Sequence, residues 1–167
     1  MDHNYQVQDG DLTLRQLAEQ DLELVRQWRN TDSIKKCFIY QEDITQEEQL
    51  KWYNKYLSAD DDIMFVIEWK NKPVGAVSLY HIDRSTHYAE FGRLMVGAME
   101  VRGLGIGKKA SKAICDFGFN ILGLKQIYLE VFADNPHAYK IYEDLGFVTT
   151  GYKDANGREL RLMLKSL

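Results

Sequence analysis

The chain has 167 residues, of which 45% are hydrophobic and 28% are charged, a composition typical of one soluble globular domain. Twenty-five acidic residues against 21 Lys and Arg give a formal net charge of −4, so the basic surface that binds nucleic acid is missing. Two cysteines are too few for a disulfide framework, and neither a signal peptide nor an apolar run long enough to cross a membrane is present, which predicts a cytoplasmic protein.

The first half of the chain predicts a short strand followed by two helices. Residues 1–9 are polar and suggest a flexible tail, and the leucines that follow alternate with polar residues as in a strand. Residues 21–30 carry apolar side chains three positions apart, which predicts a helix. Thr45 and Glu48 form a capping box that opens a second helix, extending to about Leu57.

Beyond residue 62 the periodicity changes, and strands alternate with helices. The β-type runs are 63–69, 74–82, 89–96 and 125–132. One helix ends at Gly123, another begins at Asn135–Pro136, and Asn156–Gly157 turns a closing hairpin. The strand–helix–strand unit from 89 to 132 should be a right-handed parallel crossover. The sequence therefore predicts an α/β (α+β) fold with a mixed, mostly antiparallel sheet of six to seven strands and about four helices.

Alternating glycines mark the junction between a strand and the helix that follows it. The glycines are Gly103, Gly105 and Gly107, and their basic neighbours are Arg102, Lys108 and Lys109. Such a turn presents backbone N–H groups at a helix N-terminus, where phosphate oxygens bind. The pattern lacks the Gly-Lys-Ser/Thr end of a Walker A loop and the glycine spacing of the dinucleotide fingerprint. The competing interpretation is a tight bend that binds nothing.

Two glutamates on strands are candidate general bases. Glu130 interrupts an apolar strand between Tyr128 and Phe132, so we expect its carboxylate to be partly desolvated and suited to accepting a proton. The competing interpretation is a carboxylate at a pocket mouth that meets only water. Glu90 raises the same question on the neighbouring strand. The four histidines show no spacing typical of metal ligands, so we expect no metal.

Together, two motifs resemble those of the GNAT family of N-acetyltransferases. The segment 102–107 is similar to the family's pyrophosphate loop, Gln/Arg-x-x-Gly-x-Gly/Ala, and the segment 135–147 is similar to its second cofactor motif, Asn-x-x-Ala-x-x-x-Tyr-x-x-x-Gly-Phe. The resemblance covers roughly residues 10–165. It implies a single acetyltransferase domain over 1–167 with the acyl-CoA N-acyltransferase fold, in which two parallel strands splay apart.

The resemblance implies that acetyl-CoA binds along one strand and the glycine loop. The strand backbone would pair with the pantetheine arm, and the loop amides would hold the pyrophosphate. The residues expected to contact the cofactor are Leu94, Met95, Val96, Arg102, Gly103, Leu104, Gly105, Ile106, Gly107, Lys108, Asn135 and Tyr142.

The resemblance also implies acetyl transfer to a primary amine by direct attack on the thioester. Glu130 and Tyr142 are twelve residues apart, the spacing of base and acid in relatives that acetylate ribosomal-protein N-termini. A protonated amine cannot attack until a base takes its proton. The expected catalytic residues are thus Glu130, Tyr142 and Glu90. Two alternatives stay open: a non-catalytic acyl-CoA-binding module, and a protein acetyltransferase active only in a complex.

Three segments of the N-terminal half, 28–30, 44–48 and 52–53, resemble a branch containing nucleotide-amino-sugar N-acetyltransferases, and ribosomal-protein and spermidine acetyltransferases share parts of this layout. The acceptor implied is accordingly a nucleotide amino-sugar, a polyamine or a protein N-terminus, with a homodimer left open. In the first case aromatic rings would stack on a base or sugar, and Arg29 would meet phosphate. The expected acceptor-binding residues are Trp28, Arg29, Asn30, Tyr40, Trp52 and Glu90. For Trp28, a place in the core is the competing interpretation.

Overall fold

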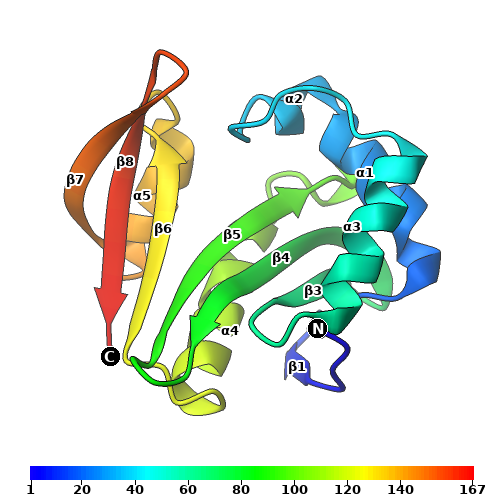
Figure 1. Cartoon of the computed structure of the whole chain (residues 1–167), viewed down its shortest axis with the longest axis horizontal. Helices are drawn as coiled ribbons and strands as arrows, with labels where there is room; N and C mark the ends of the chain where they lie inside the picture. The colour runs from blue at the N-terminus through cyan, green and yellow to red at the C-terminus, as the bar shows by residue number, and fades with distance from the viewer.

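The computed structural model describes all 167 residues as one twisted sheet with helices packed on it (Figure 1). The strands are β1 (Gln6–Asp9), β2 (Leu12–Gln16), β3 (Ile63–Trp69), β4 (Lys72–Asp83), β5 (Tyr88–Val96), β6 (Gln126–Phe132), β7 (Val148–Ala155) and β8 (Arg158–Ser166). The helices are α1 (Leu22–Asn30), α2 (Asp32–Lys35), α3 (Gln46–Ser58), α4 (Ile106–Asn120) and α5 (Pro136–Asp144), with 3-10 turns at Glu19–Asp21 and Met99–Val101. No helix is long and apolar enough to cross a bilayer.

The sheet runs in the order β1-β2-β3-β4-β5-β6-β8-β7, and every neighbouring pair is antiparallel except β5 and β6. These two strands pair only over three residues, Tyr88–Glu90 against Gln126–Tyr128, and then diverge (Figure 1). The mixed sheet with one splayed parallel pair is thereby confirmed. There are eight strands rather than six or seven, because the N-terminal segment adds β1, and the single-turn α2 adds a helix.

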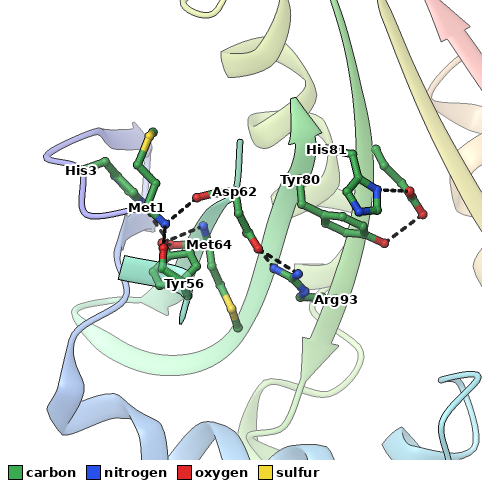
Figure 2. Close-up of polar contacts among 9 residues, drawn as sticks. Met1, His3, Tyr56, Asp62, Met64, Tyr80, His81 and Arg93 are labelled. Atoms are coloured by element: carbon green, nitrogen blue, oxygen red, sulfur yellow. Dashed lines mark hydrogen bonds and ion pairs between the residues drawn. The ribbon is translucent and has the colours of Figure 1, made fainter. Parts of the chain in front are cut away.

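The N-terminal segment is not the flexible tail that its polar composition suggested. β1 pairs with β2, with Val7 opposite Leu14. The ring of His3 is only 8% exposed and packs edge-on against Phe65. The amino group of Met1 donates to the carbonyls of Tyr56 and Asp62 (Figure 2). An edge strand exposes most of its side chains, so polarity alone could not distinguish it from a tail.

Apolar side chains fill both faces of the sheet, and each helix layer covers one face. The larger cluster includes the apolar face of α4, on the periodicity that the sequence predicts: Ile106, Ala110, Ala113, Ile114 and Phe117. The smaller cluster lies under α1 and α3. The capping box at Thr45 and the Asn135 cap of α5 both form as expected. Both helix starts are therefore set by local hydrogen bonds.

Two bulges interrupt the pairing of β4 with β5 and position the site. One lies where β5 carries an extra residue, and Arg93 there has φ +52°. The other lies near the end of β4, where His81 has φ +50°. A bulge breaks the strict alternation of side chains and re-aims the residue it contains. As a result both side chains reach the cleft described next.

Candidate active site

A cleft of about 710 Å³ opens where β5 and β6 diverge. One wall comes from α1, α3 and the segment that joins them, the other from β6 and α5, and β5 forms the floor. Nine of the residues expected from the sequence line it: Arg29, Tyr40, Trp52, Glu90, Leu94, Met95, Glu130, Asn135 and Tyr142. Segments far apart in sequence thus meet at one place, whereas Val96 and the loop residues 102–108, which were expected to contact the cofactor, do not line this cleft.

The edge of β5 that faces the gap has no strand partner beyond Glu90. On its other edge β5 still pairs with β4, where Met95 lies opposite Ala76. The N–H and C=O groups facing β6 between Leu94 and Val96 are therefore free to bond an extended chain that carries amides. The pantetheine arm of acetyl-CoA is such a chain, so the edge fits the group.

The glycine loop leads from the end of β5 into α4. Gly103 and Gly105 have φ of +79° and +72°, in the left-handed region that favours glycine. Gly105 is the N-cap of α4, and no side chain caps the helix. The first-turn N–H groups therefore lack intrahelical partners and suit an anion such as a pyrophosphate. Beside them Arg102 is exposed without an ion pair, whereas the ammonium of Lys108 lies 3.2 Å from Asp144.

Tyr142 lies deep in the cleft. Tyr142 is only 7% exposed. Its ring packs edge-on against the ring of Phe91, with a centroid distance of 5.4 Å, and against that of Phe147, at 6.0 Å. Burial raises the pKa of the Tyr142 phenol. The hydroxyl bonds to no other protein group, so it remains protonated and free to donate.

Glu130 has polar partners, and not the apolar surroundings that its sequence neighbours suggested. Its Oε1 accepts from the Tyr128 hydroxyl at 2.7 Å and from the Lys153 ammonium, and its side chain is 16% exposed. Oε2 has no partner in the protein. One oxygen of this carboxylate is held in place while the other can accept a proton in the cleft.

Glu90 bonds through both oxygens. Oε1 accepts from the Tyr80 hydroxyl at 3.0 Å, and Oε2 lies 2.9 Å from Nδ1 of His81. Figure 2 shows Tyr80 and His81 turned toward this shared carboxylate. Burial and the adjacent negative charge raise the pKa of Tyr80. Glu90 lies opposite Tyr128 across the parallel pair, and Glu130 is two residues further on, so both carboxylates share one face where the strands begin to splay.

The α1 wall holds a buried cation without an acid. Arg29 is 8% exposed; it donates one N–H to the carbonyl of Tyr40, and the other terminal nitrogen, Nη1, has no partner. The guanidinium lies over the Phe38 ring at 4.1 Å. Burial lowers the pKa of Arg29. Nη1 is itself closed off from the surface, so an anionic ligand would bond this orphaned nitrogen once the side chains that cover it move aside.

The other arginine of the cleft is fully paired. Arg93 makes two bonds to Asp62, at 2.7 and 2.9 Å. Its guanidinium lies over the rings of Tyr80 at 4.4 Å and Trp52 at 5.4 Å. Arg93 thus packs between the aromatic rings of the wall and holds them in place, and the carboxylate of Asp62 already compensates its charge.

Two of the residues expected at the acceptor lie outside the cleft. Trp28 packs in the smaller core cluster, where a Cβ on Gly97 would come within 2.1 Å of the indole, so this contact requires glycine. The side-chain amide of Asn30 makes two hydrogen bonds to the backbone of Ile44: its oxygen accepts from the Ile44 N–H at 2.7 Å, and its nitrogen donates to the Ile44 carbonyl at 2.9 Å. Asn30 therefore fixes the segment between α2 and α3, and Trp28 takes the core position that was its competing interpretation.

Sequence reasoning missed several cleft residues that have clear partners. They are Phe38, Tyr80, His81 and Arg93. Lys153, which bonds the cleft residue Glu130 from outside the cleft lining, was missed as well. His81 and Arg93 reach the cleft only because of the bulges, which leave no mark in the residue pattern. Lys153 comes from β7 across β8, and its contact depends on the register of the closing hairpin.

Comparisons with known proteins agree with this geometry. The family model for the acetyltransferase (GNAT) domain matches residues 11–148. A spermidine N(1)-acetyltransferase of Vibrio cholerae is 32% identical over 86% of this chain and 83% of that protein. Acetyltransferase PseH of Campylobacter jejuni is 25% identical over 79% of this chain and 80% of that protein.

Solved structures show the same fold. The crystal structure of the V. cholerae spermidine N-acetyltransferase, in complex with CoA and spermine, superposes with a TM-score of 0.85 at 30% identity. The match covers 95% of this chain and 96% of that one.

Proposed function

The chain belongs to the GNAT acetyltransferase family, and we propose that its acceptor is a sugar amine that also carries phosphate, as a nucleotide-linked amino sugar does. The protein is an acetyl-CoA-dependent N-acetyltransferase. Acetyl-CoA supplies the acetyl group as an activated thioester, and the acceptor supplies a primary amine.

The orphaned guanidinium of Arg29 carries the proposal. A buried cation without an acid loses hydration and gains no ion pair, so it destabilises the free protein unless a ligand compensates it. Phosphate oxygens match the forked donors of arginine better than any neutral group. Phe38 and Tyr40 contact Arg29, and Trp52 lines the same cleft. Aromatic rings such as these stack on sugars and bases.

A polyamine is the second candidate, favoured by the carboxylates of the cleft and by the spermidine acetyltransferases among the relatives. Glu48, Glu90 and Glu130 line the cleft and could attract ammonium groups. Glu130, however, is already paired with Lys153, and the buried charge of Arg29 would repel a second cation. The amino sugar therefore ranks first.

The catalytic roles follow from the free atoms of the cleft. Glu130 takes a proton from the attacking nitrogen at Oε2, the oxygen that no protein group occupies. Tyr142 donates the proton of its buried phenol to the departing sulfur. The loop from Arg102 to Gly107 holds the pyrophosphate, and the edge of β5 holds the pantetheine arm.

One sheet runs through the chain, which supports a single domain over 1–167. Two unpaired cysteines and the use of acetyl-CoA support a cytoplasmic location.

A thiol-release assay with nucleotide amino-sugars, spermidine and a peptide with a free N-terminus tests the acceptor. We expect turnover with the amino sugars. In Arg29→Gln the KM for that acceptor should rise at least about tenfold, equivalent to about 1.4 kcal/mol, with the KM for acetyl-CoA unchanged.

Arg26→Gln is the matched control. It lies on the same helix, its guanidinium pairs with Glu23 and donates to the Ile44 carbonyl that Asn30 also holds, and its own side chain does not line the cleft. If spermidine is the preferred acceptor and Arg29→Gln improves its KM, the phosphate-bearing acceptor is wrong and the polyamine takes its place.

A further inference from the structure

Each acetyl transfer removes two protons from the acceptor nitrogen. A protonated amine and a thioester become an amide, a thiol and one proton: the C–N bond forms, the C–S bond breaks, and one proton must reach solvent. On the proposed function, Glu130 takes one proton as the nitrogen attacks, Tyr142 gives one to sulfur, and the proton that Glu130 gained replaces the one that Tyr142 gave. The proton that the ammonium must lose before it can attack still needs an acceptor with a path to solvent.

His81 has the contacts that such a group needs. Its Nδ1 lies 2.9 Å from Glu90, whose other oxygen is held by Tyr80. A carboxylate at this distance keeps the hydrogen on Nδ1, which leaves the lone pair of Nε2 free and stabilises the imidazolium once it forms. The same arrangement of carboxylate and imidazole makes histidine a base in unrelated enzymes.

The ring also lies between the cleft and solvent. The His81 side chain is 68% exposed, whereas Glu90 is 18% exposed. His81 lines the cleft and also a second hollow of about 490 Å³ on its outer side. The charged groups around the ring are Glu90, Asp60, Asp61, Asp83, Arg84 and, behind Tyr80, Arg93. Acidic groups outnumber basic ones, and Arg93 is itself paired with Asp62, so the charges next to the ring are mostly negative.

We propose that Nε2 of His81 takes the proton of the acceptor ammonium and releases it to solvent, while Glu90 fixes the tautomer. The inference rests on the proposed function but not on the identity of the acceptor beyond its amine. It assigns different roles to the two carboxylates: Glu90 positions the histidine, and Glu130 acts on the nitrogen directly.

His81→Asn tests the proposal with little disturbance of the backbone. Asparagine tolerates the φ of +50°, and its amide can donate to Glu90 as Nδ1–H does, but it cannot carry a proton. We expect kcat/KM at pH 7 to fall about 10²-fold, with partial recovery at alkaline pH and on addition of free imidazole. The KM for acetyl-CoA and the melting temperature should not change.

Two variants serve as comparisons. His87→Asn is the matched control, because His87 lies on the same hairpin with φ +56° and bonds the carbonyl of Gly123, away from the cleft. It should behave as the unaltered protein. Glu130→Gln should transfer acetyl groups slowly, and free imidazole should not restore its rate. A pH profile of His81→Asn that matches the unaltered enzyme, or a loss that imidazole does not relieve, would overturn the proposal.

NMR of the His81 ring nitrogens tests the inference without any measurement of turnover. In the folded protein at pH 8, the hydrogen of the neutral His81 ring should reside on Nδ1. A hydrogen on Nε2 would leave no lone pair for the acceptor and would refute the role, even if an active acceptor is found. Failure of every amine in the thiol-release panel would instead count against the proposed function.

Discussion

Single side chains in this cleft are distinguished by which of their atoms are free. Glu130 keeps one unoccupied oxygen, whereas Glu90 uses both on Tyr80 and His81. Arg29 keeps an unoccupied nitrogen, whereas Arg93 uses its guanidinium on Asp62. Residues of the same type therefore have different chemical capacity: Oε2 of Glu130 is free for a substrate, and Nη1 of Arg29 becomes so once the side chains that cover it move aside.

At the same scale, Tyr142→Phe removes one proton donor and keeps the ring packing against Phe91. Because burial raises the pKa of this phenol, it remains protonated at neutral pH and can donate. We expect kcat to fall about 10²–10⁴-fold with the KM for acetyl-CoA unchanged, measured by initial rates.

Tyr139→Phe is the control for that measurement. It lies on the same helix beneath Arg161, outside the cleft, and should leave kcat unchanged. If the Tyr142 variant loses less than severalfold, the residue only packs, and water protonates the sulfur.

Among the elements, β5 and α4 together form the proposed cofactor cradle. Gly107 lies in the first turn of α4, and a Cβ built there would be in ordinary van der Waals contact with Leu94 at 3.9 Å and with Val96 at 4.0 Å. Its φ is not positive, so a side chain causes no backbone strain. A larger residue at this position would therefore enter the gap that the cofactor needs and leave the fold intact.

We expect Gly107→Val to weaken acetyl-CoA binding at least about tenfold, while the protein without ligand stays as stable or gains a few tenths of a kcal/mol from helix propensity. At a hundredfold excess over Kd the unaltered protein should gain about 2.7 kcal/mol, or roughly 5–11 °C in Tm. Calorimetric titration and thermal unfolding measure both quantities. Asn120→Val, at the far end of the same helix, should bind normally, and equal affinities in the two variants would place the cofactor elsewhere.

At the scale of the whole molecule, stability should depend on pH through His3. Its Nδ1 accepts from the N–H of Tyr5 at 3.2 Å and its Nε2 lies 3.3 Å from the carbonyl of Met64, so the neutral ring satisfies both nitrogens. Burial lowers the pKa of His3 below its usual 6.5. Below pH 6.5 the unfolded chain therefore takes up a proton before the folded one does, and the stability present above that pH declines as pH falls toward the folded pKa.

We expect the free energy of unfolding in urea to fall between pH 7 and pH 5, with His3 contributing at most about 1.4 kcal/mol per pH unit. His3→Phe keeps the aromatic packing on Phe65 and should show a shallower decline. His137→Gln, at an exposed position, should keep the original slope. Identical slopes in all three proteins would mean that other groups account for the acid sensitivity.

The sequence by itself determined the features that depend on near neighbours. The apolar face of α4, the caps at Thr45 and Asn135, the hairpin at Asn156 and the parallel crossover all follow from spacings of a few residues or from chain connectivity. The glycine loop could be predicted from sequence for the same reason, because its glycines are spaced two residues apart. Glu130 was singled out by its place in an apolar strand and Tyr142 by resemblance, and the fold brings both to one cleft.

Only the tertiary structure decided which groups meet across the sheet. Lys153 reaches Glu130 through the register of β7 and β8, and His81 reaches Glu90 because one extra residue in β4 turns its ring. Arg29 was expected to meet phosphate, but that its guanidinium lacks an acid became visible only in the folded chain. Strand register and bulges are set by packing of the whole sheet, so no local pattern predicts the partners of these side chains.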